Sequence, residues 1–417
     1  MLNNYICALD IGSSKIASCV VEIKRRHVTN IFFESTISKG IKEGSVVDSI
    51  ELVACIGRVL KGLKAKSGIN IKLLFANISG QDIVTKHAHA IIPLAERGNK
   101  VITLSDMHRA NEQARILGSS LEEEIIHQIP FSYSIDSKAN ILNPLGLYSH
   151  RLEVDLFLVC GKLSSIQSLS RAINQAGYEL KNLFLSGIAI SNAIFNKELK
   201  IGLNVLCDIG RDTTEILIFR DGLLRNIEIL NMGGDTLTAS LSEALKIPLD
   251  LAEDTKRSHT SVGDYERIEE DKEILIKKDN VYRPIKQKDA SSIVTSKAKF
   301  ICEHIKNSVE KNISLNMVDN FIVSGRTVLL EGFLEMFEST IGTPVKLGRI
   351  SHSEIASFVN KNEALSGQRY LTYLTSLGII CLALQGERTQ VFSTDKPIYN
   401  PILKAINKVK EVYQEYF

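Results

Sequence analysis

The sequence predicts an α/β protein with two similar lobes, and three observations lead to this prediction. The chain has 417 residues, which is too long for a single hydrophobic core, so we expect two to four subdomains. Hydrophobic residues make up 44% and charged residues 24%, as in ordinary globular proteins. A strand–turn–strand unit at the N-terminus recurs near the middle of the chain, which indicates a duplication.

Both copies of this unit begin with an Asp-Ile-Gly turn. Residues 5–23, YICALDIGSSKIASCVVEI, form an apolar run that reaches Asp10, then hydroxyl residues, a cation and an alternating strand, with a third strand at 28–37. Residues 203–230, LNVLCDIGRDTTEILIFRDGLLRNIEIL, repeat this plan from Asp208, 198 positions further on. The Asp-Gly pair in the second copy predicts a tight hairpin turn. Two similar hairpin units therefore open two similar halves.

The chemistry of these turns is that of a phosphate-binding site. Glycine lets the backbone approach an anion closely, and successive N–H groups with Ser or Thr hydroxyls can face phosphate oxygens. An Asp beside such a turn fits a water-mediated Mg²⁺ ligand next to a triphosphate. One strand–turn–strand of this composition is usually only part of a sheet. Two copies in matching context favour a nucleotide site.

Composition excludes several other classes of function. The net charge of +2 gives no electrostatic argument for nucleic-acid binding. The seven scattered cysteines contain no CxxC pair, which predicts buried thiols in a reducing cytosol. The start of the chain has no signal-peptide pattern. Residues 371–384 are too few and too polar to span a bilayer, and we expect a buried helix there.

Between the two hairpin units, residues 104–118 predict a capped amphipathic helix, 151–160 a strand and 164–176 another helix. Residues 291–311 predict a helix in the second half, with its lysines directed outward. Its expected core side chains are Ile293, Phe300, Ile301 and Ile305.

The two turns resemble the phosphate motifs of the actin, heat-shock-chaperone and sugar-kinase superfamily. Within it, KGIKEGSVVD (39–48), the block at 125–159 and NMGGDTLTASLSEALKIPLDLAEDTK (231–256) resemble FtsA, the actin-like bacterial cell-division family. The middle block is the most specific, because the rod-shape actin MreB and the sugar kinases lack it. This resemblance covers essentially the whole chain. It implies a two-lobed actin-like fold of duplicated ribonuclease-H-like type with an FtsA-type inserted subdomain.

The resemblance also implies a division of the chain. We expect the first lobe at 1–83, 163–198 (with an interlobe helix) and 351–386, the inserted subdomain at 84–162, the second lobe at 199–239 and 317–350, its small subdomain at 240–316, a linker at 387–400 and a terminal helix at 401–417.

By the same resemblance, the cleft between the lobes would bind ATP with Mg²⁺. The expected phosphate-binding residues are Asp10, Gly12, Ser13, Ser14 and Lys15 in the first lobe, and Asp208, Gly210, Thr213, Thr214, Gly233, Gly234 and Asp235 in the second. Asp10 and Asp208 would hold Mg²⁺ through water. Glu253, Lys256, Gly325 and Arg326 would surround the adenosine. Without the resemblance, Glu253 and Lys256 are an ordinary exposed i,i+3 pair.

The sequence departs from the family at three motifs. The expected DIGGGTT is DIGRDTT, with Arg211 and Asp212 in place of glycines, and Asp212 adds negative charge near the phosphates. In IVSGRTVLLEG (322–332), Arg326 and Thr327 replace glycines, and Ser186-Gly187 replaces a usual Glu-Pro. No other catalytic set is present. We therefore expect weakened ATP binding and slow hydrolysis, in an adaptor and not an enzyme.

The last seventeen residues, PILKAINKVKEVYQEYF (401–417), have an amphipathic helical pattern. A helix docked on its own domain and a helix lying in the membrane surface both fit this pattern, and the resemblance favours the membrane helix. Its expected membrane-facing residues are Ile402, Leu403, Ile406, Val409, Tyr413, Tyr416 and Phe417.

The expected function is therefore an actin-like adaptor at the division septum, on the cytoplasmic face of the bacterial inner membrane. The resemblance implies self-assembly into filaments, binding of the C-terminal tail of the tubulin-like GTPase FtsZ, and contacts with other division proteins and lipid. Lys297, Lys299 and Lys306 are candidate contacts for the acidic tail, with a solvated helix face as the alternative. Two other functions remain open: an adaptor like the pilus-assembly protein PilM, and a sugar or acetate kinase.

Overall fold

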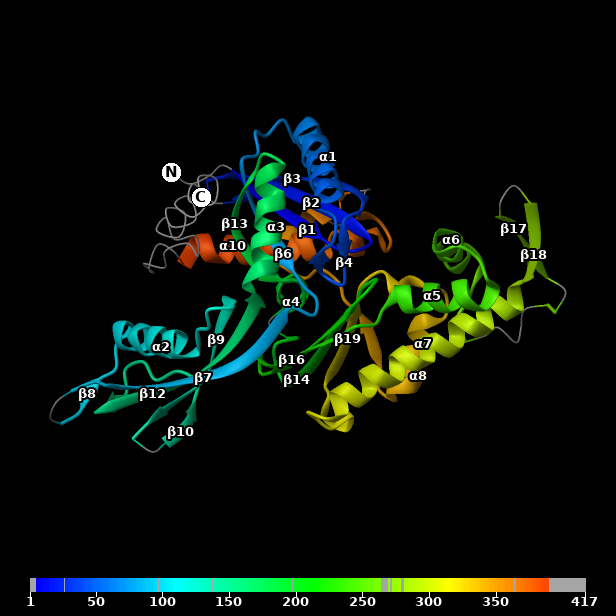
Figure 1. Ribbon diagram of the computed structural model, residues 1–417. Coiled ribbons are helices and arrows are strands. Elements are labelled where there is room, and N and C mark those ends of the chain that lie inside the picture. Colours follow the sequence, from blue (N-terminus) through cyan, green and yellow to red (C-terminus); the bar gives the residue numbers. More distant parts are fainter. Residues whose placement is uncertain are drawn as a thin grey trace, which may run out of the picture.

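In the computed structural model, the two hairpin units become the first three strands of two five-stranded sheets (Figure 1). The structure describes residues 5–389 except 26, 96–97, 137, 197, 264–268, 271, 279–280, 360 and 363–364. The first sheet has the order β13-β6-β1-β2-β3 and the second β16-β15-β14-β19-β20. Each combines an antiparallel meander with two parallel strands, so the predicted duplication is confirmed.

The first sheet is covered on both faces because its strands are apolar on both sides. Its strands are β1 (Tyr5–Ile11), β2 (Lys15–Lys24), β3 (His27–Ile37), β6 (Leu73–Ile78) and β13 (Glu179–Leu185). Cys7 and Leu9 pack toward α1 (Ser49–Ser67) and α3 (Leu163–Gln175), whereas Ile6 and Ala8 face α4 (Ser186–Ile194) and α10 (Leu374–Thr389). Helix α1 is capped at its start by the side chain of Asp48. The short strands β4 (Ile41–Lys42) and β5 (Ser45–Val46) form a turn beside this lobe.

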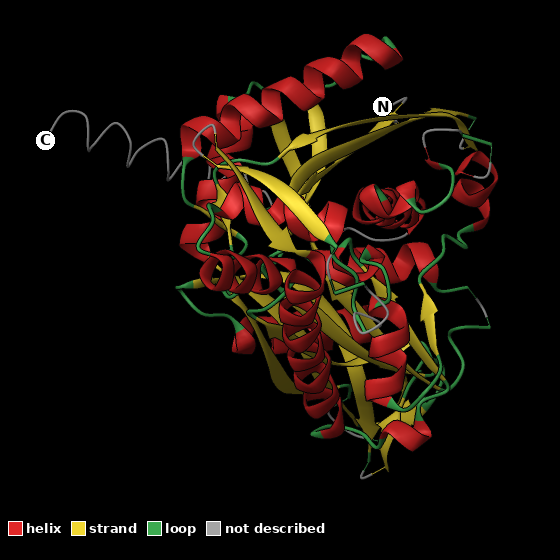
Figure 2. Ribbon diagram, turned by 90° about the vertical axis from the view of Figure 1, so that its right-hand side faces the viewer, coloured by secondary structure: helices red, strands yellow, loops and turns green. Residues whose placement is uncertain are grey.

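The second sheet consists of β14 (Leu203–Ile209), β15 (Thr214–Arg220), β16 (Leu223–Leu230), β19 (Asn320–Ser324) and β20 (Val345–Leu347). The predicted Asp221-Gly222 turn joins β15 and β16 with both residues at positive φ, 52° and 76°. One face of the sheet packs on α5 (Gly234–Leu245), α7 (Gln287–Glu310) and α8 (Phe333–Ile341). Helix α6 (Leu249–His259) and the hairpin of β17 (Glu273–Lys278) and β18 (Val281–Lys286) extend this side. Figure 2 shows helices on both sides of the strands.

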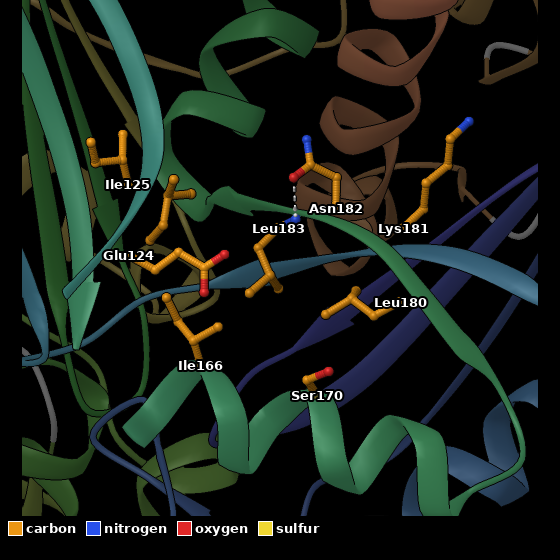
Figure 3. A pocket seen from close by; sticks show the side chains of 9 residues that line it. Glu124, Ile125, Ile166, Ser170, Leu180, Lys181, Asn182 and Leu183 are labelled. Carbon is orange, nitrogen blue, oxygen red and sulfur yellow. Dashed lines mark hydrogen bonds between the residues drawn. The ribbon is translucent and has the colours of Figure 1, made fainter. Parts of the chain in front are cut away.

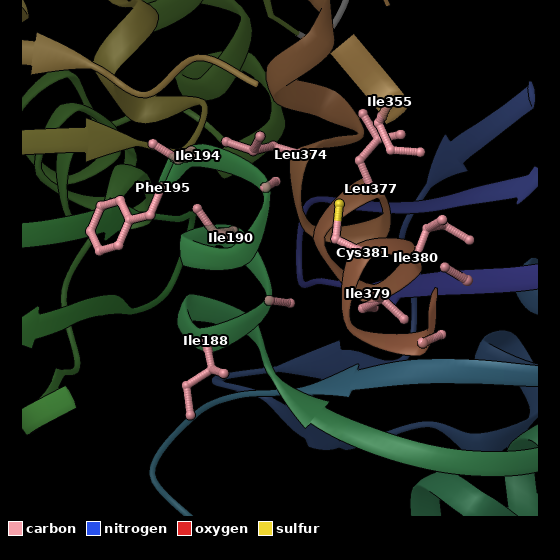
Figure 4. Close-up of a cluster of buried hydrophobic side chains, with 14 of the residues drawn as sticks. Ile188, Ile190, Ile194, Phe195, Ile355, Leu374, Leu377, Ile379, Ile380 and Cys381 are labelled. Carbon is pink, nitrogen blue, oxygen red and sulfur yellow. The ribbon is translucent and has the colours of Figure 1, made fainter. Parts of the chain in front are cut away.

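The two lobes share one hydrophobic core around α4 and α10 (Figure 4). Side chains of α4, such as Ile188 and Ile190, pack with Leu377 and Ile380 of α10. The same cluster includes Leu206 and other buried residues of the second sheet. The chain returns to the first lobe through α9 (Ser353–Val359) and the 3₁₀ turn η5 (Arg369–Thr372). The interlobe helix is therefore buried between the two sheets.

A separate four-stranded sheet is inserted between β6 and α3. Its order is β10-β9-β12-β7, with β7 at Ile83–Pro93, β9 at Glu123–Ile135, β10 at Lys138–Ile141 and β12 at Arg151–Lys162. Helix α2 (Leu104–Gly118) covers one face, and β8 (Lys100–Val101) pairs with β11 (Tyr148–Ser149). Figure 1 shows this sheet and the β17–β18 hairpin at opposite sides of the molecule.

Most predicted elements are confirmed. Helix α2 has the predicted bounds and a capping box between Thr103 and Asp106. All seven cysteines are buried and free, and 374–384 is a buried helical segment. One prediction is wrong: Phe300 of α7 is 40% exposed and does not face the core. The buried stripe of α7 instead contains small residues such as Ala290, Ala298 and Cys302.

Candidate functional site

The two Asp-Ile-Gly turns have the same geometry. In the first, the N–H of Gly12 donates to the carbonyl of Lys15 at 3.0 Å, and in the second the N–H of Gly210 donates to the carbonyl of Thr213 at 2.9 Å. Burial is the main cause of the raised pKa of Asp208, and the charges of Asp10 and Lys15 on the first turn also act on this group. The structure thus places the two predicted phosphate turns at one site between the lobes.

The first turn offers two hydroxyl groups to a ligand. Ser13 and Ser14 are partly exposed, and neither side chain hydrogen-bonds to another described residue. Lys15 is held by Asp10, with 2.5 Å between Nζ and Oδ2. The ammonium is therefore positioned by a carboxylate at the edge of the site, 14% exposed.

Asn77, at the end of β6, supports Asp10 from behind. Its Nδ2 donates to Asp10 Oδ1 at 3.0 Å and to Ser186 Oγ at 2.9 Å, and its Oδ1 accepts from the N–H of Ile11 at 2.6 Å. Asn77 is 3% exposed. This one amide joins the first turn to the start of the interlobe helix α4.

In the second turn, Ser324 of β19 donates to Asp208 Oδ1 at 2.7 Å. Burial and the neighbouring Asp10 raise the pKa of Asp208 to about 6. Thr213 is partly exposed, and its hydroxyl has no hydrogen-bond partner in the described part of the chain. Thr214 differs from the prediction: it is fully buried and donates to the carbonyl of Met232 at 2.8 Å, so its hydroxyl is already paired within the second lobe.

Asp10 and Asp208 are the type of ligand that a magnesium ion prefers. Mg²⁺ is usually held by one or two carboxylates together with phosphate oxygens and water. Asp10 and Asp208, one on each turn, supply two carboxylates for such a donor set. Within the described residues there is no group of three or more His, Cys, Asp or Glu side chains that could hold a metal alone.

Arg211 and the Gly233–Asp235 turn are bound to each other. Arg211 donates through Nε and Nη2 to Asp235 Oδ1, both at 3.1 Å. The N–H of Asp235 donates to the carbonyl of Arg211 at 2.7 Å, and that of Gly234 to the carbonyl of Gly210 at 3.0 Å. A Cβ on Gly233 would lie 2.5 Å from the carbonyl oxygen of Gly210. The start of α5 therefore packs directly on the second turn.

Glu253 and Lys256 are not an exposed pair. Lys256 is 5% exposed, and its Nζ donates to the carbonyl of Gly234 at 2.8 Å, to Thr238 Oγ1 at 2.7 Å and to Glu253 Oε2 at 2.5 Å. Thr238 also donates to Glu253. Lys256 thus lies at the buried centre of a polar network behind the second turn, and Glu253 is its partly exposed member.

Gly325 and Arg326 directly follow β19, next to the second turn. Gly325 has a φ of 93°, and a Cβ there would lie 2.2 Å from the carbonyl oxygen of Ile209, so only glycine fits this approach. Thr327 donates to the carbonyl of Gly210 at 2.7 Å. Arg326 is exposed and makes no hydrogen bond or ion pair to any residue that the structure describes.

The start of α4 makes a hydrogen bond that is possible because Ser186-Gly187 stands where the family usually has Glu-Pro. The N–H of Gly187 donates to Glu215 Oε2 at 2.6 Å, a bond that a proline at this position could not form. Burial raises the pKa of Glu215 to about 8, and Asp208 and Asp10 contribute in the same direction. Glu215 thus brings a carboxyl group with a raised pKa from β15 to the interlobe helix.

The three lysines of α7 have different surroundings. Lys299 is exposed. Lys297 Nζ lies 5.3 Å from the centroid of the Phe300 ring, and Lys306 donates to the carbonyl of Thr340 at 3.0 Å. Only Lys299 is fully available to a partner. The predicted membrane-facing residues at 402–417 lie outside the described residues. None of the described helices is both long and apolar enough to cross a membrane.

A small pocket of about 40 Å³ lies where β9 meets α3 and β13 (Figure 3). Its apolar walls include Ile166 and Leu183, and Figure 3 shows the Glu124 carboxyl directed toward them. Burial raises the pKa of Glu124. A pocket of this volume is too small for a nucleotide, so it is separate from the candidate site.

Sequence reasoning missed Asn77, Glu215, Ser324 and Thr238. Their signal was a polar residue inside an otherwise buried strand or helix face, as Asn77 in LLFANI shows. Such a residue must find a hydrogen bond, but its partner is on another part of the chain.

Comparison with known proteins places the chain among division proteins. A family profile described as "Cell division protein FtsA" matches residues 205–374, and one described as "SHS2 domain inserted in FTSA" matches residues 80–160. The cell division protein FtsA of Borreliella burgdorferi is 26% identical over 84% of this chain and 85% of its own length. FtsA of Pseudomonas aeruginosa is 23% identical over 97% and 96%.

Among solved structures, the fold is similar to the PilM-PilN type IV pilus biogenesis complex, with a TM-score of 0.61, 15% identity and coverage of 91% of this chain and 98% of the other. It is also similar to MreB5 of Spiroplasma citri bound to ADP, with a TM-score of 0.53, 10% identity and coverage of 93% and 98%. At such identities the likeness shows the actin-like fold alone, and the predicted fold class is confirmed.

Proposed function

Since the chain belongs to the FtsA family of actin-like cell-division proteins, we propose that it binds ATP with Mg²⁺ between its lobes and works as an adaptor. The observation that carries this proposal is the pair of matching turns. They bring together Asp10, Asp208 and three hydroxyls that form no hydrogen bond to any described residue. Hydroxyls and carboxylates in this arrangement suit phosphate oxygens and a hydrated Mg²⁺.

In this proposal, the side chains have distinct tasks. Ser13, Ser14 and Thr213 donate to phosphate oxygens, Lys15 neutralises their charge, and Asp10 and Asp208 hold water on Mg²⁺. Bound Mg²⁺ would supply positive charge beside the phosphates. The adenosine is surrounded by four residues of the second lobe, Glu253, Lys256, Gly325 and Arg326. The relative MreB5 was solved with ADP, which agrees with a nucleotide in this fold.

Slow turnover follows from the same geometry. Arg211 is held by Asp235, and the carboxyl group of Glu215, whose pKa burial raises to about 8, accepts a hydrogen bond from the N–H of Gly187. Each group is thus engaged in a contact within the protein. We therefore propose that ATP serves mainly as a structural ligand.

Calorimetry with ATP and Mg²⁺ tests the nucleotide part. We expect binding to the full chain with slow release of phosphate, and loss of binding in Asp10→Ala and Asp208→Ala. The matched control is Asp250→Ala. Asp250 is an exposed residue of α6, and its carboxylate accepts a hydrogen bond from the adjacent N–H of Leu251. A flat titration with the folded wild-type chain would overturn this part.

The adaptor part comprises self-assembly, FtsZ binding and attachment to the inner membrane at the septum. Co-pelleting with FtsZ is expected, and Lys299→Glu should weaken it because Lys299 is the exposed lysine of the three. Failure to co-pellet would favour a PilM-like adaptor, for which the present support is fold alone.

Sedimentation with anionic vesicles tests the membrane attachment. Deleting residues 401–417 should abolish pelleting, because these residues have the amphipathic pattern of an interfacial helix. Unchanged pelleting of the truncated chain would count against the anchor.

A further inference from the structure

A carboxylate in the second phosphate turn reaches across to the first lobe. Asp212 Oδ2 accepts a hydrogen bond from the backbone N–H of Glu43 at 2.8 Å, between residues 169 positions apart. The Asp212 side chain is 8% exposed. In the duplicated first turn, the strand register places Ser14 at the equivalent position. The interlobe contact therefore arises where the second copy carries a charge in place of a hydroxyl.

The donor side of this contact is fixed to the first lobe. Glu43 lies between β4 and β5 with a φ of 52°, which is unusual for a residue other than glycine. A Cβ on the next residue, Gly44, would lie 2.1 Å from the carbonyl oxygen of Ser79, and one on Gly80 would lie 2.2 Å from that of Glu43. Gln81 also donates to the Glu43 carboxylate at 2.6 Å. The Glu43 N–H can thus move only with the first lobe.

The acceptor side is fixed to the second lobe. Arg211, adjacent to Asp212, is bound to Asp235 at the start of α5, and Gly210 accepts from both Gly234 and Thr327. With both partners held, a change in the angle between the lobes must lengthen the Asp212–Glu43 bond. Hydrogen bonds weaken steeply with misalignment, and those to carboxylates are the stronger ones.

We propose that Asp212 is an interlobe latch that holds the lobes closed without a nucleotide, by supplying the negative charge that a triphosphate would bring to the second turn. A terminal phosphate that approaches this turn meets a carboxylate, so the site should favour a nucleoside diphosphate over a triphosphate. This preference rests on the proposed nucleotide binding, whereas the latch itself does not.

Hydrogen exchange of the full chain without nucleotide tests the latch. The Glu43 amide should be protected in the wild type and exchange about ten to a hundred times faster in Asp212→Ala. Asp212→Asn keeps a carbonyl acceptor and should restore part of the protection. Asp250→Ala is again the matched control and should leave Glu43 unchanged. Circular dichroism verifies that each variant is folded. An unprotected Glu43 amide in the wild type, or equal protection in folded Asp212→Ala, would overturn the latch.

Calorimetry with ADP and ATP tests the nucleotide preference. The ratio of ATP to ADP affinity should rise about tenfold in Asp212→Asn, because the substitution removes the charge and keeps the shape. An unchanged ratio would overturn the preference. If the wild type binds neither nucleotide while Asp212→Ala still releases the Glu43 amide, the proposed function fails and the latch stands.

Discussion

At the scale of residues, the cleft depends on buried polar side chains whose partners come from distant strands. Asn77 is the clearest case, because one amide satisfies Asp10, the Ile11 N–H and Ser186. A buried polar group that loses its partner costs the free energy of desolvation without compensation. The turn geometry at Asp10 is therefore set partly from β6.

Replacing Asn77 by Ala should lower both stability and nucleotide affinity. The substitution leaves the Ile11 N–H and one Asp10 oxygen unpaired in a buried site, at a cost of about 1–3 kcal/mol each. Thermal unfolding measures the first effect and calorimetry with ATP the second. Unchanged affinity in a destabilised variant would show that Asn77 supports the fold but does not position Asp10.

His127 predicts a pH dependence of stability. Its Nε2 accepts the N–H of Leu185 at 2.9 Å, and burial lowers its pKa to about 4. In the unfolded chain the pKa of a histidine is near 6.5, so His127 takes up a proton more readily in the unfolded chain than in the folded protein. The free energy of unfolding should fall by up to roughly 3 kcal/mol as the pH drops from about 6.5 to about 4. Stability above pH 7 is unaffected.

Denaturation at several pH values measures this effect. In His127→Gln, the side-chain oxygen can still accept from Leu185, but no proton is taken up, so part of the slope between pH 6.5 and 4 should disappear. Equal slopes in the wild type and the variant would contradict the assignment.

The sequence was sufficient to find the Asp-Ile-Gly turns, because each glycine and hydroxyl acts within a few residues of its neighbours. It was not sufficient to separate Thr213 from Thr214, since that depends on which side of β15 faces the cleft. The contacts of Glu215 and Asp212 were also out of reach. Both join groups that only the closure of the two lobes brings together.

At the scale of elements, caps and periodicity predicted most helices well, and α2 begins directly after its N-cap Thr103, which forms a capping box with Asp106. The error at α7 has a physical cause. Large apolar residues dominate a periodicity argument, whereas the actual buried stripe also includes small residues such as Ala290 and Ala298. Phe300 was left outside this stripe, where its ring contacts His304 with centroids 4.0 Å apart.

The crossing of α4 and α10 gives a prediction with an internal control. A Cβ on Gly378 would lie 1.9 Å from the carbonyl oxygen of Ala189, whereas a Cβ on Gly386 of the same helix meets nothing within 4 Å. Gly378→Ala should therefore destabilise the protein by about 1–3 kcal/mol through overpacking, despite the better helix propensity of alanine. Gly386→Ala should be neutral or slightly stabilising. Comparable thermal midpoints for both variants would contradict close packing at this crossing.

At the scale of the whole molecule, the duplication was visible in the sequence because both hairpin units keep the same order of apolar, acidic and glycine residues. The sequence did not reveal how the parts are joined. In the structure, β9 of the inserted sheet contacts the first lobe through His127 and the second lobe through Phe131. The inserted sheet therefore spans the junction of the lobes.

Arg225 of β16 makes the second of these contacts, and its removal should uncouple the inserted sheet from the second lobe. Its Nη1 donates to the carbonyl of Phe131 at 3.1 Å, and its guanidinium lies 4.5 Å from the centroid of the Phe131 ring. A charged hydrogen bond and a cation–π contact together are worth about 2–4 kcal/mol. Arg225→Ala should therefore raise hydrogen exchange in β9 and β16 by at least tenfold, and Arg225→Lys should restore only part of it, because lysine lacks the planar fork.

Arg220 provides the control for this experiment. It is exposed at the end of β15 and makes no hydrogen bond or ion pair to any described residue, so Arg220→Ala should leave exchange in β9 unchanged. If Arg225→Ala changes exchange in β16 alone, the arginine stabilises its own strand, and the inserted sheet is held to the lobes by other contacts. If β9 and β16 respond together, motion of the inserted sheet and closure of the cleft are linked through this residue, because both depend on the position of the second lobe.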